Sequence, residues 1–430
     1  MQLDSWQIKT VFELGHRNPG TVQTGPFGSQ LHADDYVEDG VPFILIRNIG
    51  QNGLILDDMP RITEKDAQRL KRYALKAGDI VFSRVGRVGS CFLATGEHEG
   101  WLISGQTLRI RLPSDNLNLE YILYSLRNKE TQDFIAGASV GTTRSSINTE
   151  ILQSLPVQLP PLPEQNAIAS VLAAVDRAIE QTEALIAKYQ RIKTGLLHDL
   201  LTRGIDKHGQ LRDPATHNFK PSPLGLVPEE WEVATVKRLF TMDLGKMLSK
   251  AAKIGKSPKP YLGNKNVQWG WVDVSDLETM DFSIEEQNRL RLKRHDILIC
   301  EGGEVGRAAL WNDELDECYF QKAIHRLRPA GGYVSPQFML YYMQFAVKRG
   351  LLQILTSQTS IAHLTQEKLA ELPICHPKPD EMAQIVATLE QQVSTIRVEE
   401  ERLTKLQKLK TGLMQDLLTG KVSVAALLNP

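Results

Sequence analysis

The residues that could do chemistry are sparse in this sequence, and none has the spacing of a known catalytic motif. The glycine clusters at 86–89 and 302–306 lack the G-x-x-x-x-G-K-[ST] pattern that cradles phosphate, and G-x-G-x-x-G is absent there as well. We interpret these clusters as turns of a sheet. The acids and the ten histidines form no H-E-x-x-H, no H-x-E with C-x-x-C, and no compact carboxylate pair with a lysine that would indicate a nuclease. The sequence therefore predicts no catalytic residue and no metal site.

The four cysteines are scattered along the chain, at Cys91, Cys300, Cys318 and Cys375. No C-x-x-C spacing occurs, so neither a zinc cage nor a disulfide framework is indicated. We expect all four side chains to be buried as small apolar groups.

Two sets of polar side chains are the candidates for binding. Six lysines fall in the stretch 244–272, which contains no acidic residue: Lys246, Lys250, Lys253, Lys256, Lys259 and Lys265. Because lysine is a flexible point charge, we expect this series to contact phosphate rather than bases. Side chains suited to base edges or phosphates are Arg47, Asn48, Arg84, Arg87, Arg144, Asn264, Asn266, Arg294 and Arg307, and polar loops add Thr142, Thr143, Thr359 and Ser360. A basic run is also common on a solvated face, so these residues alone leave nucleic-acid binding open.

The composition is that of a globular protein, with 42% hydrophobic residues and 50 Lys+Arg against 51 Asp+Glu in 430 residues. A net charge of -1 gives no global footprint for nucleic acid, so any such contact must come from local patches. No apolar run reaches the roughly 18 residues of a membrane span, and the N-terminus lacks the plan of a signal peptide. We therefore expect a cytoplasmic protein without a membrane partner.

The elements that must position these side chains form a long internal repeat. When the sequence is aligned with itself so that 193–202 fall on 410–419, eight of these ten pairs are identical. The same alignment places 78–82 on 295–299 and 119–124 on 336–341, and near the start a slightly larger shift matches Trp6 with Trp231. Similarity is weak across 16–77 and 240–294. Two copies of one unit therefore share a scaffold and differ in the side chains of these two divergent regions.

Each copy ends in a connector that predicts a long helix with a heptad seam. The first seam is Ile168, Leu172, Val175, Ile179, Thr182, Ile186, Tyr189, Lys193, Leu196 and Leu200. The second is Ile385, Leu389, Gln392, Ile396, Leu403, Leu406, Leu413 and Leu417, with Glu399 and Lys410 as polar interruptions. Proline and carboxylates in the first turn are typical of a helix start. The simplest partner for each helix is the other connector, and the alternative is that each helix packs on its own globular domain.

The globular halves mix short β-branched runs with turns and short helices, which indicates an α+β or α/β fold. The predicted fold is thus mixed, with two globular domains separated by two long helices that form an antiparallel coiled coil with pseudo-twofold symmetry. The predicted segments are a first domain at 1–158, a helix at 159–205, a linker at 206–230, a second domain at 231–375, a helix at 376–420 and a tail at 421–430.

Two variable globular domains alternating with two nearly identical helical connectors resemble the DNA-specificity subunit of type I restriction-modification systems. The motifs that carry the resemblance are Thr24–Ser29, Gly78–Val81 with Val88-Gly89, and Leu155–Gln165 followed by a helix that closes on 193–197. The resemblance covers essentially the whole chain.

This resemblance implies that each globular part is a target-recognition domain reading one half of a split, asymmetric DNA site, with Gly28 and Ser29 among the DNA-binding residues. It implies that the connectors set the spacing and dock the partners. The implied partners are double-stranded DNA, two methyltransferase subunits and two restriction subunits. S-adenosylmethionine, ATP and Mg²⁺ are then expected on those subunits, and no cofactor is expected on this chain.

The sequence departs from the family pattern in two places. The second domain has Leu244-Gly245-Lys246-Met247 where the first has Gly25–Ser29, which predicts different half-sites. The second connector has Pro379-Asp380-Glu381-Met382 for Pro163-Glu164-Gln165, a drift expected to affect one docking contact. Two other classes stay open: a single-chain nuclease or restriction-enzyme fragment, and a coiled-coil adaptor without DNA contact.

Overall fold

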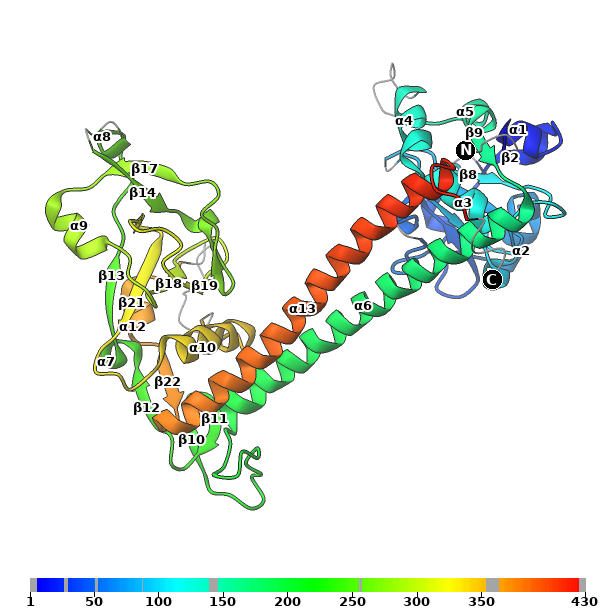
Figure 1. Cartoon of the computed structure of the whole chain (residues 1–430). Coiled ribbons are helices and arrows are strands. Elements are labelled where there is room, and N and C mark those ends of the chain that lie inside the picture. Colours follow the sequence, from blue (N-terminus) through cyan, green and yellow to red (C-terminus); the bar gives the residue numbers. More distant parts are fainter. Residues whose placement is uncertain are drawn as a thin grey trace. The chain divides into compact units, whose positions relative to one another are not determined.

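The computed structural model describes residues 6–26, 30–50, 53–86, 88–138, 146–253, 255, 257–352 and 363–424. The chain divides into two units. The first unit is 1–183 with 401–430, and the second is 184–400. Each unit contains one globular domain and one part of each long helix (Figure 1).

The first unit is built on small sheets of mixed strand direction. Strands run in the order β2-β8-β5-β6 in one sheet and β4-β3-β7 in another, while β1 pairs with β9. All these pairs are antiparallel except β3 with β7. The strands are β1 Gln7–Thr10, β2 Val22–Thr24, β3 Val41–Ile44, β4 Arg61–Ile62, β5 Ile80–Ser83, β6 Cys91–Leu93, β7 Leu102–Ile103, β8 Thr107–Ile110 and β9 Pro156–Leu159.

The second unit repeats this plan and adds two two-stranded sheets, β10-β11 and β15-β16. Its orders are β13-β21-β18-β19 and β17-β14-β20, and β12 pairs with β22. The parallel pair is again the last in the smaller sheet, β14 with β20. The strands are β10 Phe219–Ser222, β11 Gly225–Pro228, β12 Glu232–Thr235, β13 Phe240–Leu244, β14 Pro258–Leu262, β15 Val267–Gln268, β16 Trp271–Val272, β17 Glu278–Asp281, β18 Ile297–Cys300, β19 Ala308–Leu310, β20 Tyr319–Phe320, β21 Ile324–Pro329 and β22 Pro373–His376.

The repeat extends into the regions of weak sequence similarity. Val41 pairs with Ile62 in the first unit, and Lys259 pairs with Met280 in the second, so both members of the pair are displaced equally along the chain. The predicted α+β repeat is confirmed, and the scaffold continues where the sequences diverge.

Short helices cap the sheets in both units. The equivalent helices α3 and α10 start in the same way, because Asn118 and Ser335 each accept a hydrogen bond from the third backbone N–H of the helix. The helices of the first unit are α1 Val11–Leu14, α2 Glu64–Arg69, α3 Leu119–Arg127, α4 Lys129–Ala138 and α5 Thr149–Ser154. Those of the second are α7 Val236–Leu239, α8 Lys250–Lys253, α9 Ile284–Leu290, α10 Pro336–Lys348 and α12 Gln366–Ala370.

The connectors are the helices α6 (Leu162–Thr202) and α13 (Pro379–Leu418), of 41 and 40 residues. In each unit their parts lie side by side and run antiparallel (Figure 1). In the second unit the Gln392 side chain donates to the Tyr189 carbonyl at 3.1 Å, and in the first Lys410 pairs with Asp176 at 2.6 Å. Every seam position named above is buried or partly buried. The predicted heptad seam is thus confirmed, and its interruption Lys410 is matched by a carboxylate.

The segment 206–230, predicted to be a linker, has structure of its own. Strands β10 and β11 form a hairpin, and Arg212 is bound to Glu381 at the start of α13. Pro221 and Pro228 lie in this hairpin and Pro223 lies in its turn, where a missing N–H is tolerated.

All four cysteines are buried and free, as predicted. Burial raises the pKa of the Cys91 thiol to about 11, so it stays protonated near neutral pH. Among the helices of the described residues, none is long and apolar enough to cross a membrane.

Candidate nucleic-acid interface

The first unit brings several predicted residues together where strand ends meet. The Gly25 N–H donates to Thr107, the Ser104 N–H to Ile44, and the Arg84 N–H to Gln106. The Ile147 N–H then donates to the Arg84 carbonyl. We call this group, residues 24–26, 44–48, 84–86, 104–107 and 146–147, the first loop cluster.

The second unit forms the same cluster from equivalent loops. The Gly245 N–H donates to Ile324, the Lys246 N–H to Phe320, and the Glu301 N–H to Ala323. The Leu364 N–H donates to the Glu301 carbonyl, as Ile147 does to Arg84. We call residues 244–246, 262–266, 301–307, 320–324 and 363–364 the second loop cluster. Gln106 and the pair Gln321-Lys322 belong to these clusters and were missed, because only their position between two strand ends marks them.

One glycine is required in each cluster. A Cβ on Gly25 would lie 2.2 Å from the Ser104 carbonyl oxygen, and a Cβ on Gly245 would lie 2.3 Å from that of Gln321. Backbone passes too closely for any side chain. Of the family motif at 24–29, the second domain therefore keeps the glycine that the fold needs and changes its neighbours.

Asn48 and Asn266 are equivalent and hold a turn in each cluster. Asn48 accepts from the Leu45 N–H and donates to the carbonyls of Ile55 and Asp57. Asn266 accepts from the N–H of Gly263 and donates in the same way to the carbonyls of residues 273 and 276. The exposed fractions of the two side chains are 0% and 3%. Neither reaches solvent here, so we reassign both from base contact to a structural role.

An ion pair joins the two strands that lead into each cluster, at the strand ends away from the cluster. Arg111 binds Asp79 at 2.5 Å in the first unit, and Arg328 binds Asp296 at 2.5 Å in the second. Asp79 and Asp296 are 1–2% exposed. Breaking such a pair leaves a buried charge, so these pairs fix the strands β5 and β8, and β18 and β21, that end in the clusters.

The lysines of the acid-free stretch are paired with carboxylates that the sequence places elsewhere. Lys246 contacts Glu286 at 2.5 Å and also lies 5.3 Å from the centre of the Phe282 ring. The other pairs are Lys253 with Glu278 at 3.1 Å, Lys259 with Glu317 at 2.8 Å and Lys265 with Asp276 at 2.7 Å. The acid-free stretch predicted lysines without neighbouring acids, and for these four lysines that prediction is wrong. Hydrogen bonds from Tyr261 and Lys253 hold the pKa of Glu278 below its ordinary value, so this carboxylate stays charged.

The remaining candidates are distributed unevenly. Arg47 is exposed and donates to the Asp58 carbonyl, Arg84 is partly buried, and Arg294 is exposed outside the clusters. Asn264 donates to the Gly302 carbonyl, and Arg307 donates to the Asn264 carbonyl, so these two lie together in the second cluster. Gly28, Ser29, Arg87, Thr142, Thr143, Arg144, Lys256, Thr359 and Ser360 lie outside the described residues, as does the side chain of Lys250.

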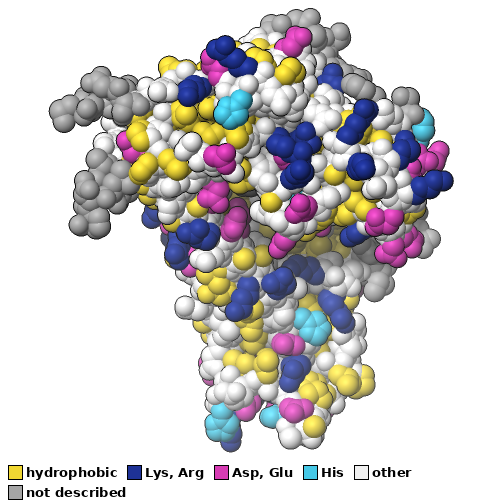
Figure 2. Space-filling view, turned by 90° about the vertical axis from the view of Figure 1, so that its right-hand side faces the viewer, with side chains coloured by type: hydrophobic (Ala, Val, Ile, Leu, Met, Phe, Trp, Pro, Cys, Tyr) yellow, Lys and Arg dark blue, Asp and Glu magenta, His cyan; other side chains and the backbone are white. Residues whose placement is uncertain are grey.

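Charge is mixed on the face that Figure 2 shows. In Figure 2, Lys and Arg side chains are interspersed with Asp and Glu and with apolar groups. Opposite charges on this face partly cancel each other's field.

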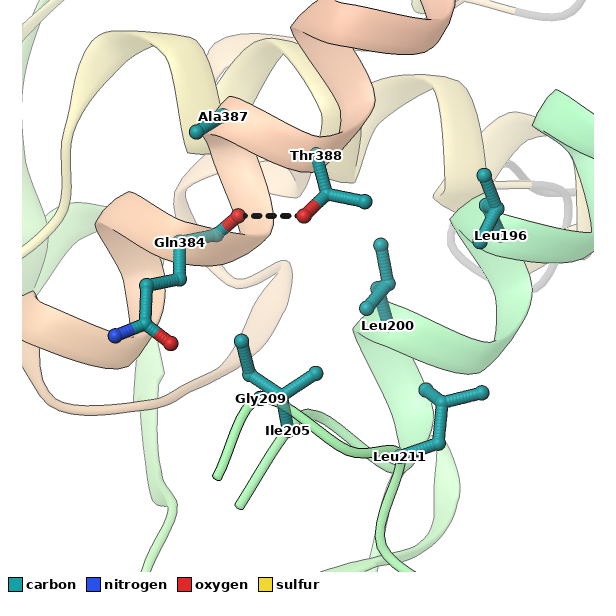
Figure 3. A pocket seen from close by; sticks show the side chains of 8 residues that line it. All are labelled: Leu196, Leu200, Ile205, Gly209, Leu211, Gln384, Ala387 and Thr388. Atoms are coloured by element: carbon teal, nitrogen blue, oxygen red, sulfur yellow. Dashed lines mark hydrogen bonds between the residues drawn. The ribbon is translucent and has the colours of Figure 1, made fainter. Parts of the chain in front are cut away.

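A cavity of about 440 Å³ in the second unit is a weaker candidate (Figure 3). It is lined by Leu196, Leu200, Ile205, Gly209, Leu211, Gln384, Ala387 and Thr388. The Thr388 hydroxyl already donates to the Gln384 carbonyl at 2.9 Å. Its lining is mostly apolar, which makes it a poor site for a polar ligand. Among the described residues, no group of three or more His, Cys, Asp and Glu side chains is arranged to hold a metal ion.

The comparisons with known proteins decide the family. A model described as the type I restriction modification DNA specificity domain matches residues 6–190 and 228–408, one match in each copy of the repeat. The chain belongs to this family. It is therefore a specificity subunit with two DNA target-recognition domains, and its role is non-catalytic, as the sequence predicted.

Individual relatives agree over nearly the full length. The putative type I restriction enzyme MjaX specificity subunit of Methanocaldococcus jannaschii is 25% identical over 399 residues, covering 90% of this chain and 88% of the relative. The EcoBI specificity subunit of Escherichia coli is 22% identical, covering 91% and 85%. The solved S subunit from M. genitalium has a TM-score of 0.55 at 16% identity, with 97% and 98% covered, and shares the fold.

A first prediction concerns the paired lysines. Replacing Glu278 with glutamine removes the negative charge beside Lys253, so it should strengthen binding of the assembled complex to unrelated DNA and steepen the dependence of log K on log salt by up to about one unit. The measurement is binding at several salt concentrations. Glu232, an exposed acid on β12, provides the control Glu232→Gln. An unchanged slope for Glu278→Gln, with a slope reduced by about one for Lys253→Ala, would show that Lys253 leaves its carboxylate when DNA binds.

Proposed function

We propose that each globular domain reads one half of a bipartite, asymmetric DNA site. The observation that carries this proposal is the pair of loop clusters: one backbone framework occurs twice and displays different side chains. Two copies in one chain can lie on one duplex as the subunits of a dimeric repressor do, but they are free to diverge, so the target need not be palindromic.

The test is replacement of residues 1–158 by the first domain of another family member, with the chain expressed beside its methyltransferase subunit. Mapping of methylated bases across the genome should show one half of the motif changed and the other half retained. A change in both halves, or a motif without two separated parts, would contradict modular reading.

The connectors are proposed to set the spacing of the half-sites and to dock two methyltransferase subunits. Equivalent apolar side chains support two equivalent docking sites. Ile192 on α6 and Leu409 on α13 occupy matched positions of the repeat, and they are 40% and 50% exposed. Both lie in near-identical surroundings, Gln190–Gly195 and Gln407–Gly412. Two copies of one docking contact would place an apolar group at the same position of each repeat.

We therefore predict that Ile192→Asp and Leu409→Asp each release one methyltransferase copy and that the double variant releases both. A carboxylate placed at a desolvated contact should cost about 2 kcal/mol or more of binding free energy. The mass of the purified complex measures the outcome. Val398 is 58% exposed on α13 and corresponds to Gln181 in the repeat, so it belongs to no matched apolar pair; Val398→Asp is the control and should keep both copies.

The catalytic steps are proposed to belong to the partners. S-adenosylmethionine would serve the methyltransferase subunits, and ATP and Mg²⁺ would serve two restriction subunits where those are present. This chain contributes the choice of site.

A further inference from the structure

One loop of the clusters has glycines of matching conformation in both domains. It follows β5 in the first domain and β18 in the second, and both strands pair with an equivalent neighbour in equivalent register. Gly86 and Gly303 have φ of 72° and 74°, and Gly89 and Gly306 have φ of 89° and 84°. These positive values favour glycine, and they recur at matched positions of the two loops. Side chains at matched positions in this loop can therefore be compared directly.

The charges at matched positions are reversed. When the two glycine pairs are aligned, Arg84 corresponds to Glu301, and Arg87 corresponds to Glu304. Ser90 corresponds to Arg307. Arginine offers only hydrogen-bond donors and an ionised carboxylate offers only acceptors, so the two loops present opposite hydrogen-bonding chemistry.

Glu304 is held in one orientation although its side chain is 51% exposed. The Trp269 indole N–H donates to one carboxylate oxygen at 2.6 Å, and Arg307 donates to the other at 3.3 Å. Arg307 is itself fixed, since it is 17% exposed and donates to the Asn264 carbonyl at 2.7 Å. Asn264 in turn donates to the Gly302 carbonyl of the same loop.

The exposed Glu304 carboxylate can accept further hydrogen bonds. A carboxylate has about four lone-pair positions, and the Trp269 and Arg307 donors use two of them. A preorganised carboxylate at the edge of the cluster would be repelled by phosphate, and it suits a donor on a base. In the major groove those donors are the exocyclic amino groups of cytosine and adenine, whereas arginine suits the acceptors of guanine.

We propose that Glu304, positioned by Trp269 and Arg307, reads an exocyclic amino group of cytosine or adenine in the second half-site. This inference rests on the proposed function and adds to it the chemistry that the second domain selects.

The experiment exchanges the charges in the full chain, expressed with its methyltransferase subunit. Glu304→Arg should change the base preference at one position of the second half-site, from cytosine or adenine toward guanine, by about tenfold or more in relative methylation. The first half-site should stay unchanged. The native base at the affected position distinguishes cytosine from adenine.

Two further variants complete the test. Glu232→Arg reverses an exposed charge on β12 of the same domain and should leave the motif intact. If Glu304→Arg prevents assembly, the isosteric variant Glu304→Gln provides the test. An amide can donate as well as accept, so this variant should relax the base preference at that one position. A native two-part motif that neither Glu304 variant alters would overturn this inference and leave the proposed function standing. Absence of a two-part motif from the native chain would instead overturn the proposed function.

Discussion

Replacement of Glu381 by alanine is expected to lower the free energy of unfolding of the second unit by about 3–5 kcal/mol. The Glu381 carboxylate accepts hydrogen bonds from both terminal nitrogens of Arg212, at 2.6 and 3.0 Å. It also accepts from the Trp231 indole N–H at 3.2 Å and from the Ile205 N–H at 3.0 Å. Arg212 is only 9% exposed, and its other carboxylate contact, Glu230, is 3.4 Å away and 64% exposed. The alanine variant would leave a buried guanidinium and two further donors poorly matched.

The same chain supplies the control for this prediction. Glu164 is equivalent to Glu381 by the repeat and accepts from the Trp6 indole N–H at 3.1 Å, without an arginine partner among the described contacts. Glu164→Ala should therefore cost only about 1 kcal/mol. Urea denaturation followed by tryptophan fluorescence measures both. Equal losses for the two variants would show that the Arg212 pair contributes little to stability.

This pair of tryptophan–glutamate bonds also resolves the apparent drift in the second connector. Proline and acidic residues around Pro379 differ from those around Pro163, yet Glu381 and Glu164 both bind the tryptophan that precedes the first strand of their domain. The sequence correctly matched Trp6 with Trp231. It could not show that the carboxylates are the partners, because that contact joins parts of the chain that are far apart in sequence.

What the sequence predicted well depends on local periodicity. A heptad seam specifies a helix face within a few residues, so Ile168, Leu172 and Ile385 could be assigned to the buried face, and they are 0–1% exposed. The repeat itself follows from identity along the chain. Both features can be identified without knowledge of the tertiary contacts.

The predictions that were wrong concern side chains whose partners cannot be identified from the neighbouring sequence. Lys259 is neutralised by Glu317, 58 residues further on, and no local charge count detects that pair. Asparagine is a good candidate for reading adenine, but Asn48 and Asn266 are occupied by backbone groups 7–10 residues away. Their shared spacing in the two copies was a signal, because a residue that recurs where the domains otherwise diverge serves the scaffold.

Insertion of two residues into both connectors should abolish sequence-specific methylation. The Tyr189 carbonyl accepts from Gln392 in the second unit, and the helices run antiparallel, so the point on α13 opposite Ala187 falls near Ser394. Two residues rotate the helix beyond them by about 200°, which turns the apolar seam away from its partner. Inserting them after Ala187 and after Ser394 lengthens both helices equally, so rotation is the change being tested.

Four residues at the same two points are the matched comparison. They add roughly 6 Å and slightly more than one turn, which nearly preserves the seam. Since DNA rises about 3.4 Å per base pair, the four-residue variant should methylate the same two half-sites with a spacer longer by about one or at most two base pairs. Methylation mapping reads both outcomes. If the two-residue and four-residue variants both kept the native motif and spacer, the distance between half-sites would have to be fixed by the partner subunits, and the connectors would act as docking surfaces alone.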